Sequence, residues 1–144
     1  MESSVSTKKR EGALRKPSIA IPEEELERLS RLAESASRAM PEVAEYLQIE
    51  LDRAKIVPLR RADHVVRMGT SVEYRDEVTG KSYAVTLVYP GESDIAQGRV
   101  SVLTPIGAAL LGLSVGQTID WTTRSGETRQ LTIVSVSNAA VSVH

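Results

Sequence analysis

The sequence contains no cysteine and no phenylalanine, and it has only two histidines, four tyrosines and one tryptophan among 144 residues. Without cysteine the chain cannot form a disulfide, a thiolate metal site or a thiol nucleophile, and this composition suits a reducing compartment. The scarcity of aromatic side chains argues against an aromatic-lined ligand pocket and against base stacking on nucleic acid. Because His64 and His144 lie far apart in the sequence, we expect no two-histidine metal site.

Long hydrophobic runs are also missing. No stretch approaches the roughly 18 apolar residues of a membrane span, and the first residues lack the apolar segment of a signal peptide. We therefore expect a cytoplasmic protein that does not associate with membranes. What is present is 41% apolar and 26% charged residues with a net charge of −1, which is ordinary for a soluble globular protein.

Charge divides the chain into segments. Residues 1–18 hold five basic and two acidic residues in a serine-containing stretch without apolar periodicity, so we expect a disordered basic leader. A solvated leader without a specific role is the simpler interpretation, and weak contact with nucleic acid is the alternative. Residues 19–57 are acidic, residues 58–68 form a connector, and residues 69–144 form a separate domain.

The acidic segment contains two apolar stripes with helical spacing. The first begins behind Pro22, which we place at the first helical position before a turn of glutamates, and the second begins at Pro41 and ends before Pro58. Because residues 37–40 form a short connection, the two helices should pack antiparallel as a short finger that leans on the rest of the protein. Four leucines should then meet across the seam: Leu29, Leu32, Leu47 and Leu51.

After the connector the apolar period changes to two, which is typical of strands. We predict five strands, most of them antiparallel neighbours, over residues 71–76, 81–88, 99–102, 118–123 and 129–136. One short helix interrupts them, with Thr104 as its N-cap, Pro105 as its first residue and Gly112 as a left-handed stop. The predicted fold class is α+β, with an antiparallel two-helix finger followed by a strongly bent antiparallel sheet around one helix.

The sequence contains no recognisable catalytic, phosphate-binding or metal-binding motif. Gly107 and Gly112 have the spacing of a phosphate-binding loop, but residues 113–114 are Leu-Ser where a lysine is needed, so we interpret the glycines as a helix stop and a close packing contact. Acidic pairs such as Glu42 and Glu45 are interpreted as solvated surface carboxylates. We therefore predict no catalytic residue, no metal and no cofactor.

A more informative pattern lies in the second half of the chain. Several stretches resemble, in order and spacing, the C-terminal domain of the bacterial Gre transcription elongation factors: residues 78–80, Tyr83, residues 93–94, residues 98–101 and, most specifically, the block 101–116. Three further stretches extend the resemblance to the Gre relatives called regulators of nucleoside diphosphate kinase (Rnk), which have a shorter finger: residues 26–29, 44–54 and 86–90. Together the resemblance covers roughly residues 19–136.

The resemblance implies an FKBP-like fold for the C-terminal domain and docking at the rim of the secondary channel of RNA polymerase. In Gre factors the loop before the proline-containing helix makes this contact, and the corresponding residues here are Leu103, Thr104 and Pro105. Gre factors commonly carry Asp or Asn where this chain has Leu103, so we expect an apolar contact to replace a polar one. We expect Leu103 to belong to the loop surface and not to the core.

The resemblance also identifies a finger tip. In Gre factors the tip carries an Asp and a Glu that help to hold a catalytic Mg²⁺ for cleavage of backtracked RNA. Glu42 falls on that Glu, Ala39 falls on that Asp, and Met40 lies between them. Because a divalent ion needs several oxygen ligands, the tip of this chain should not hold it.

We therefore expect a non-catalytic regulator of transcription that binds bacterial RNA polymerase at the secondary channel and competes with Gre-like factors. It should act as a monomer and meet nucleic acid only indirectly, through the polymerase. One alternative is a Gre-like transcript cleavage factor. A second is an FKBP-like peptidyl-prolyl isomerase, although a chain without phenylalanine lacks the residues of an aromatic-walled pocket.

Overall fold

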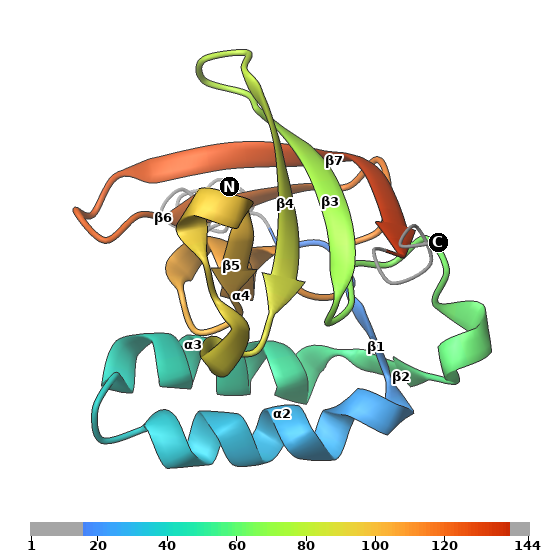
Figure 1. The fold of residues 1–144 in the computed structure, drawn as a ribbon, viewed down its shortest axis with the longest axis vertical. Coiled ribbons are helices and arrows are strands. Elements are labelled where there is room, and N and C mark those ends of the chain that lie inside the picture. Colours follow the sequence, from blue (N-terminus) through green and yellow to red (C-terminus); the bar gives the residue numbers. More distant parts are fainter. Residues whose placement is uncertain (1–15, 139–144) are drawn as a thin grey trace, which may run out of the picture.

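The computed structural model describes residues 16–138, and its first two helices pack antiparallel as a hairpin (Figure 1). Helix α2 spans Glu23–Ala36 and helix α3 spans Pro41–Arg53. Three glutamates lie in the first turn of α2 and Pro41 opens α3, as the sequence predicted. Pro22 is not helical, however, because its extended backbone places it at the N-cap of α2.

The predicted seam between the helices is confirmed. Leu29, Leu47 and Leu51 are buried in a single hydrophobic cluster, and Leu32 packs against its edge. A four-residue turn separates α2 from α3, so the helices run antiparallel and their apolar stripes face each other.

A small parallel sheet, which the sequence did not predict, joins the two ends of the helical hairpin. Strand β1 (Ala20–Pro22) pairs with strand β2 (Lys55–Val57). Each of these strands has only three residues and lies next to a helix of the hairpin, so the helical spacing of the neighbouring residues obscures it in the sequence. On its other side β1 meets the larger domain, since the Ala20 N–H donates to the Gly112 carbonyl over 3.0 Å.

Five further strands form one curled sheet in the order β5-β4-β3-β7-β6. Their bounds agree closely with the predicted strands: β3 (Thr70–Asp76), β4 (Ser82–Val88), β5 (Arg99–Ser101), β6 (Thr118–Thr122) and β7 (Thr128–Asn138). Most neighbouring strands are antiparallel, as predicted, but β5 pairs in parallel with β4, so the sheet is mixed. Two 3-10 turns between these strands carry the chain back to the level of Thr86, so that β5 runs in the same direction beside the last three residues of β4: η2 (Pro90–Glu92) and η3 (Ile95–Gln97).

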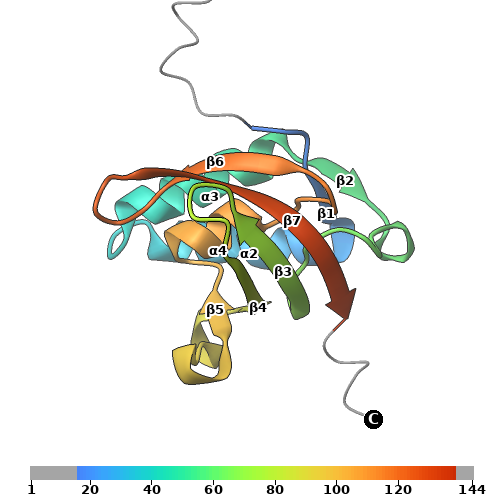
Figure 2. The ribbon, with the colours of Figure 1, turned by 90° about the horizontal axis from the view of Figure 1, so that it is seen from above.

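The sheet curls around helix α4 (Pro105–Leu110), as the view from above shows (Figure 2). A register shift between Glu73 and Tyr74 interrupts the pairing of β3 with β7, and irregularities of this kind strengthen the bend of a sheet. Gly112 follows α4 with φ of 82°, so the predicted left-handed stop is confirmed.

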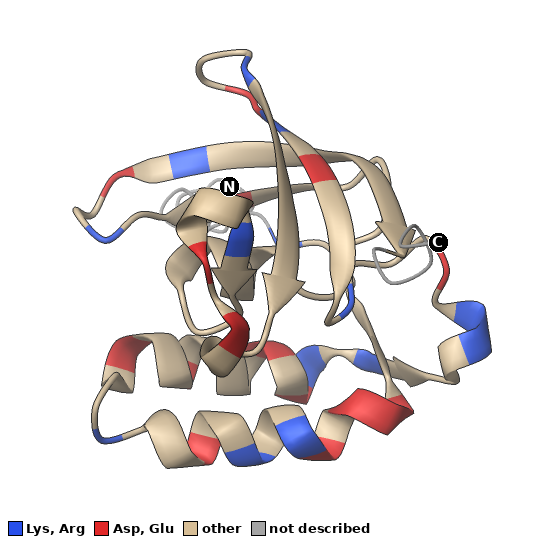
Figure 3. Cartoon of the chain, viewed as in Figure 1, with Lys and Arg blue, Asp and Glu red and all other residues tan. Residues whose placement is uncertain are grey.

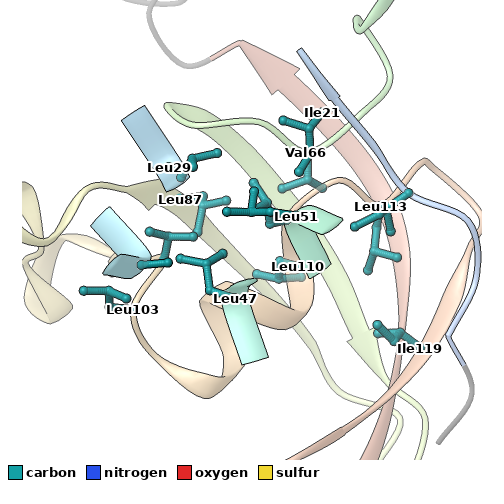
Figure 4. Close-up of a cluster of buried hydrophobic side chains, with 14 of the residues drawn as sticks. Ile21, Leu29, Leu47, Leu51, Val66, Leu87, Leu103, Leu110, Leu113 and Ile119 are labelled. Carbon is teal, nitrogen blue, oxygen red and sulfur yellow. The ribbon is translucent and has the colours of Figure 1, made fainter. Parts of the chain in front are cut away.

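The helical hairpin lies along the sheet domain and shares its core. Figure 4 shows Leu47 and Leu51 of α3 beside Leu110 of α4, within one cluster of buried side chains. The hairpin therefore packs over much of its length against the rest of the protein and does not project from it (Figure 1). Among the helices of residues 16–138, none is long and apolar enough to span a membrane.

The first described residues bind the hairpin. Lys16 Nζ lies 3.1 Å from the carboxylate of Glu50, which is only 1% exposed and is also paired with Arg53 at 2.7 Å. Arg53 donates to the Pro17 carbonyl and Gln117 donates to the Ser18 carbonyl. Ordered contacts thus begin before the predicted end of the leader at residue 18, while residues 1–15 lie outside the described part. The connector 58–68 contains one 3-10 turn, η1 (Leu59–Arg61).

One carboxylate stabilises the β3–β4 turn. Asp76 is 8% exposed, accepts hydrogen bonds from the backbone N–H of Val78 and Thr79, and pairs with Arg129 at 2.8 Å. Burial acts to raise the pKa of Asp76, but the two N–H groups and the Arg129 guanidinium together lower it below its ordinary value. The folded state therefore favours the ionised form of Asp76.

We expect Asp76→Asn to lower the free energy of unfolding by about 1 kcal/mol at neutral pH. A carboxyl group with a lowered folded pKa contributes stability above its unfolded pKa of about 4 and loses that contribution as the pH falls through its folded pKa. Urea unfolding from neutral pH to about pH 2 should therefore show a shallower acid decline for Asp76→Asn than for the wild type. Glu73→Gln, at an exposed position of the same strand, is the control; equal acid declines for both variants would contradict this role.

Candidate functional site

The residues predicted for the finger tip and for the docking loop line one hollow. This hollow, which we call the tip hollow, has a volume of about 630 Å³ and lies between the α2–α3 turn, the loop before α4 and the β6–β7 turn. Ala39, Met40 and Glu42 line it from the hairpin, and Leu103 and Pro105 line it from the loop. The sequence placed these two groups on separate domains, and the packing of the hairpin brings them together.

The loop before α4 is held by its own hydrogen bonds. The Leu103 N–H donates to the Ser101 hydroxyl, the Thr104 hydroxyl donates to the Ser101 carbonyl over 2.7 Å, and the same hydroxyl accepts from the Gly107 N–H over 3.1 Å. Thr104 is thus the N-cap of α4, as predicted, and it does not line the hollow. Among the three predicted loop residues, Pro105 combines partial exposure with a place in the lining.

Leu103 departs from its expected position. Its side chain is only 7% exposed and belongs to the hydrophobic core cluster (Figure 4). The expectation that Leu103 belongs to the loop surface and not to the core is therefore wrong. The turn from β5 into α4 directs this side chain toward the hairpin, so that Leu103 forms a wall of the hollow and is anchored in the core at the same time.

The hairpin turn presents exposed side chains to the hollow. Ala39 and Glu42 are exposed, and Met40 is 45% exposed although it is apolar. Met40 occupies the N-cap position of α3 and makes no side-chain capping bond, so the first N–H groups of this helix lack a side-chain acceptor there. Across residues 16–138 no group of three or more histidines or acidic residues is placed to hold a metal ion.

Tyr46 of α3 also lines the hollow, and sequence reasoning missed it. Its hydroxyl oxygen is buried and has no hydrogen-bond partner. Burial, followed by the nearby Glu50 carboxylate, raises the pKa of Tyr46 to about 12, so the hydroxyl keeps its proton at neutral pH. Lys16 Nζ lies 4.4 Å from the centre of the ring. In the sequence Tyr46 lies within the second predicted helix but outside its apolar stripe, and no pattern marks it as a site residue.

The β6–β7 turn closes the third side with Thr123 and the exposed Arg124. The Thr123 hydroxyl is within 3.0 Å of the Ser125 hydroxyl and accepts from the Glu127 N–H, which holds the turn together. No sequence signal pointed to Arg124, because a single arginine in a turn is common on protein surfaces.

A second, more open hollow of about 700 Å³ lies between α2 and η2. Arg28 stacks on the ring of Tyr89 with its guanidinium carbon 3.7 Å from the ring centre, and Arg31 pairs with Glu27 at 3.5 Å. The stacking attaches η2 to the outer side of α2. None of the predicted site residues lies here.

Two family models match the chain over most of its length. The model described as "Transcription elongation factor, GreA/GreB, C-term" matches residues 61–138, and the model described as "Rnk N-terminus" matches residues 17–57. The two matches correspond to the sheet domain and to the helical hairpin with strands β1 and β2.

Individual proteins give the same result. The chain is 35% identical over 122 residues to the "Regulator of nucleoside diphosphate kinase" of Escherichia coli (strain K12). The aligned residues cover 84% of this chain and 90% of that protein. It is 33% identical over 81 residues to the "Transcription elongation factor GreA" of Methylobacterium sp. (strain 4-46), and this alignment covers 56% of this chain and 51% of that protein. Among solved structures, "Prokaryotic transcription elongation factor GreA/GreB from Nitrosomonas europaea" aligns with a TM-score of 0.66 and 36% identity over 85% of this chain and 99% of that chain.

Proposed function

The chain belongs to the Rnk and GreA/GreB family of transcription factors, and we propose that it is a non-catalytic regulator that binds bacterial RNA polymerase. In this proposal it docks at the rim of the secondary channel through the loop before α4 and competes there with Gre-like factors. It acts as a monomer in the cytoplasm and meets nucleic acid only through the polymerase.

One observation carries the non-catalytic part of this proposal. The hairpin tip lies beside the loop before α4, because both line the tip hollow. A loop that rests on the polymerase surface would therefore keep the tip at that surface as well. Helix α3 has 13 residues and is roughly 20 Å long, and its packing against the sheet domain leaves little of that length free to extend.

The chemistry of the tip supports the same conclusion. Glu42 is the acidic residue in the lining of the tip hollow, and Ala39 supplies no second carboxylate. A Mg²⁺ ion bound by protein usually takes one or two carboxylates together with other oxygen ligands in an octahedral arrangement. A single exposed carboxylate beside apolar side chains is a weak site for such an ion.

The test is RNA cleavage stimulated by a Gre factor in a stalled elongation complex, titrated with this protein. We expect cleavage to fall as the protein concentration rises, because the two factors would compete for the same docking site on the polymerase. A parallel titration without the Gre factor should give no cleavage above the polymerase alone. Cleavage in that control would favour the alternative of a Gre-like cleavage factor, and an unchanged rate at saturating protein would contradict competition.

A second carboxylate at the hairpin tip should not produce RNA cleavage. We expect Ala39→Asp to leave RNA cleavage within about twofold of the wild-type protein, since the tip still lies beside the docking loop and lacks reach. Ala39 is exposed, so the variant should fold normally. The measurement is the same elongation complex without any Gre factor. Strong cleavage by Ala39→Asp would show that the hairpin reaches the active centre of the polymerase.

A further inference from the structure

We infer that the tip hollow receives an apolar side chain of RNA polymerase that has an acidic residue beside it. This inference rests on the proposed function. It extends the docking surface to the predicted tip residue Met40 and to two residues that were not predicted as site residues, Tyr46 and Arg124.

The lining of the tip hollow is largely apolar. Met40, Pro41 and Val43 supply apolar surface from the hairpin, and the core residue Leu103 lies opposite with Pro105. Met40 keeps 45% of its surface exposed at the rim. Apolar side chains that line a concave surface favour an apolar occupant, and pockets of this kind hold the residues that dominate many interfaces.

Hydrogen-bond donors without a side-chain partner occur in two of the residues or elements that line the hollow, the start of α3 and Tyr46. The first turn of α3 faces the hollow through Pro41, Glu42 and Val43, and no side chain caps the end of this helix. The protonated Tyr46 hydroxyl is buried without a partner. Glu42 is the one carboxylate in the lining, so an occupant that supplies a further carboxylate would satisfy these donors.

Charge at the rim favours the same occupant. Arg124 is exposed and takes part in none of the ion pairs found within residues 16–138. Arg38 lies next to Ala39 in the hairpin turn and is likewise absent from those pairs. Figure 3 shows a basic segment in each of these two turns. A carboxylate beside the apolar group would meet these cations, which also steer association.

The hollow between α2 and η2 is a weaker candidate. Arg28 there is stacked on Tyr89, and Arg31 is paired with Glu27. The two arginines of that hollow already have partners within the chain, whereas Arg124 takes part in none of the ion pairs of the described residues. For this reason the tip hollow carries the inference.

Two variants test the inference in titrations of RNA polymerase with the fluorescently labelled full-length protein. We expect Met40→Ser and Arg124→Glu each to raise the Kd for polymerase by about tenfold. Ile49→Ser is the matched control for Met40, because Ile49 lies on α3, the helix that Met40 precedes, is 48% exposed and does not line the hollow. Arg60→Glu, in the exposed turn η1, is the control for the charge reversal.

Tyr46→Phe separates binding from stability. Removing a buried hydroxyl that lacks a partner should keep or raise the melting temperature of the free protein. If the hydroxyl donates to the occupant, the same variant should bind polymerase about fivefold more weakly. A higher melting temperature with unchanged affinity would show that the hydroxyl has no part in binding and would overturn its assignment.

The outcomes distinguish the inference from the proposed function. If the wild-type protein does not bind polymerase, the proposed function fails and the inference fails with it. If the wild type binds and Met40→Ser and Arg124→Glu bind as well as their controls, the proposed function stands and the inference about the tip hollow is overturned. Weaker binding of both variants with normal controls supports it.

Discussion

Gly107→Ala is expected to destabilise the protein by about 3 kcal/mol. Gly107 lies in the first turn of α4, and a methyl group on it would collide with the carbonyl of Ser101 at the end of β5. This carbonyl cannot move away cheaply, because it accepts hydrogen bonds from the Thr104 N–H and from the Thr104 hydroxyl. Alanine at position 107 would therefore force α4 away from β5 or break the N-cap of α4.

The measurement is urea unfolding followed by circular dichroism, with Gly91→Ala as the matched control. Gly91 lies in η2, has no neighbour within 4 Å of the position of an added methyl group and does not adopt a positive φ. We expect Gly91→Ala to change the free energy of unfolding by about 0.5 kcal/mol or less. Equal unfolding midpoints for the two variants would contradict the close approach of α4 to β5.

Leu103→Asp is expected to destabilise the protein by about 4 kcal/mol. Leu103 is 7% exposed within the core cluster, so the substitution removes an apolar side chain and buries a carboxylate in its place. The pKa of such a carboxyl group would rise on burial, and the protein should therefore recover part of its stability as the pH falls below about 5.

Leu103→Met provides the control for this prediction. It conserves the volume and the apolar character of the side chain, so we expect a loss of about 1 kcal/mol or less in the same unfolding experiment. If Leu103→Asp had the same unfolding midpoint as the wild-type protein, the side chain at position 103 would have to be solvated. Because of the expected instability, weak polymerase binding by Leu103→Asp would not identify Leu103 as a contact, whereas Met40→Ser changes an exposed residue.

Much of the local structure could be predicted from the sequence. The glutamates after Pro22 and the proline at position 41 mark helix starts through the helix dipole and the missing N–H group of proline, and both effects act within one turn. Thr104 as N-cap and Gly112 as a left-handed stop are local in the same way. The four longer strands of the larger sheet followed from an alternation that each strand carries by itself.

The candidate site was predictable in part. The resemblance to Gre factors pointed to the loop before α4 and to the hairpin turn, and the structure places both at one hollow. It did not show that Leu103 is buried, because a leucine in a loop has the same pattern whether it faces solvent or core. Tyr46 and Arg124 carried no signal, since each becomes notable only beside residues that are distant in the chain.

The sequence by itself determined the helices, most strands, the family resemblance and the absence of a second carboxylate at the tip. The tertiary structure alone decided that the hairpin lies along the sheet domain and that its tip meets the loop before α4. The position of the hairpin depends on contacts between distant segments, such as Lys16 with Glu50 and β1 with β2. Burial of Leu47 in the shared core adds to them. Such contacts form only when the whole chain folds, so no local pattern of residues specifies them.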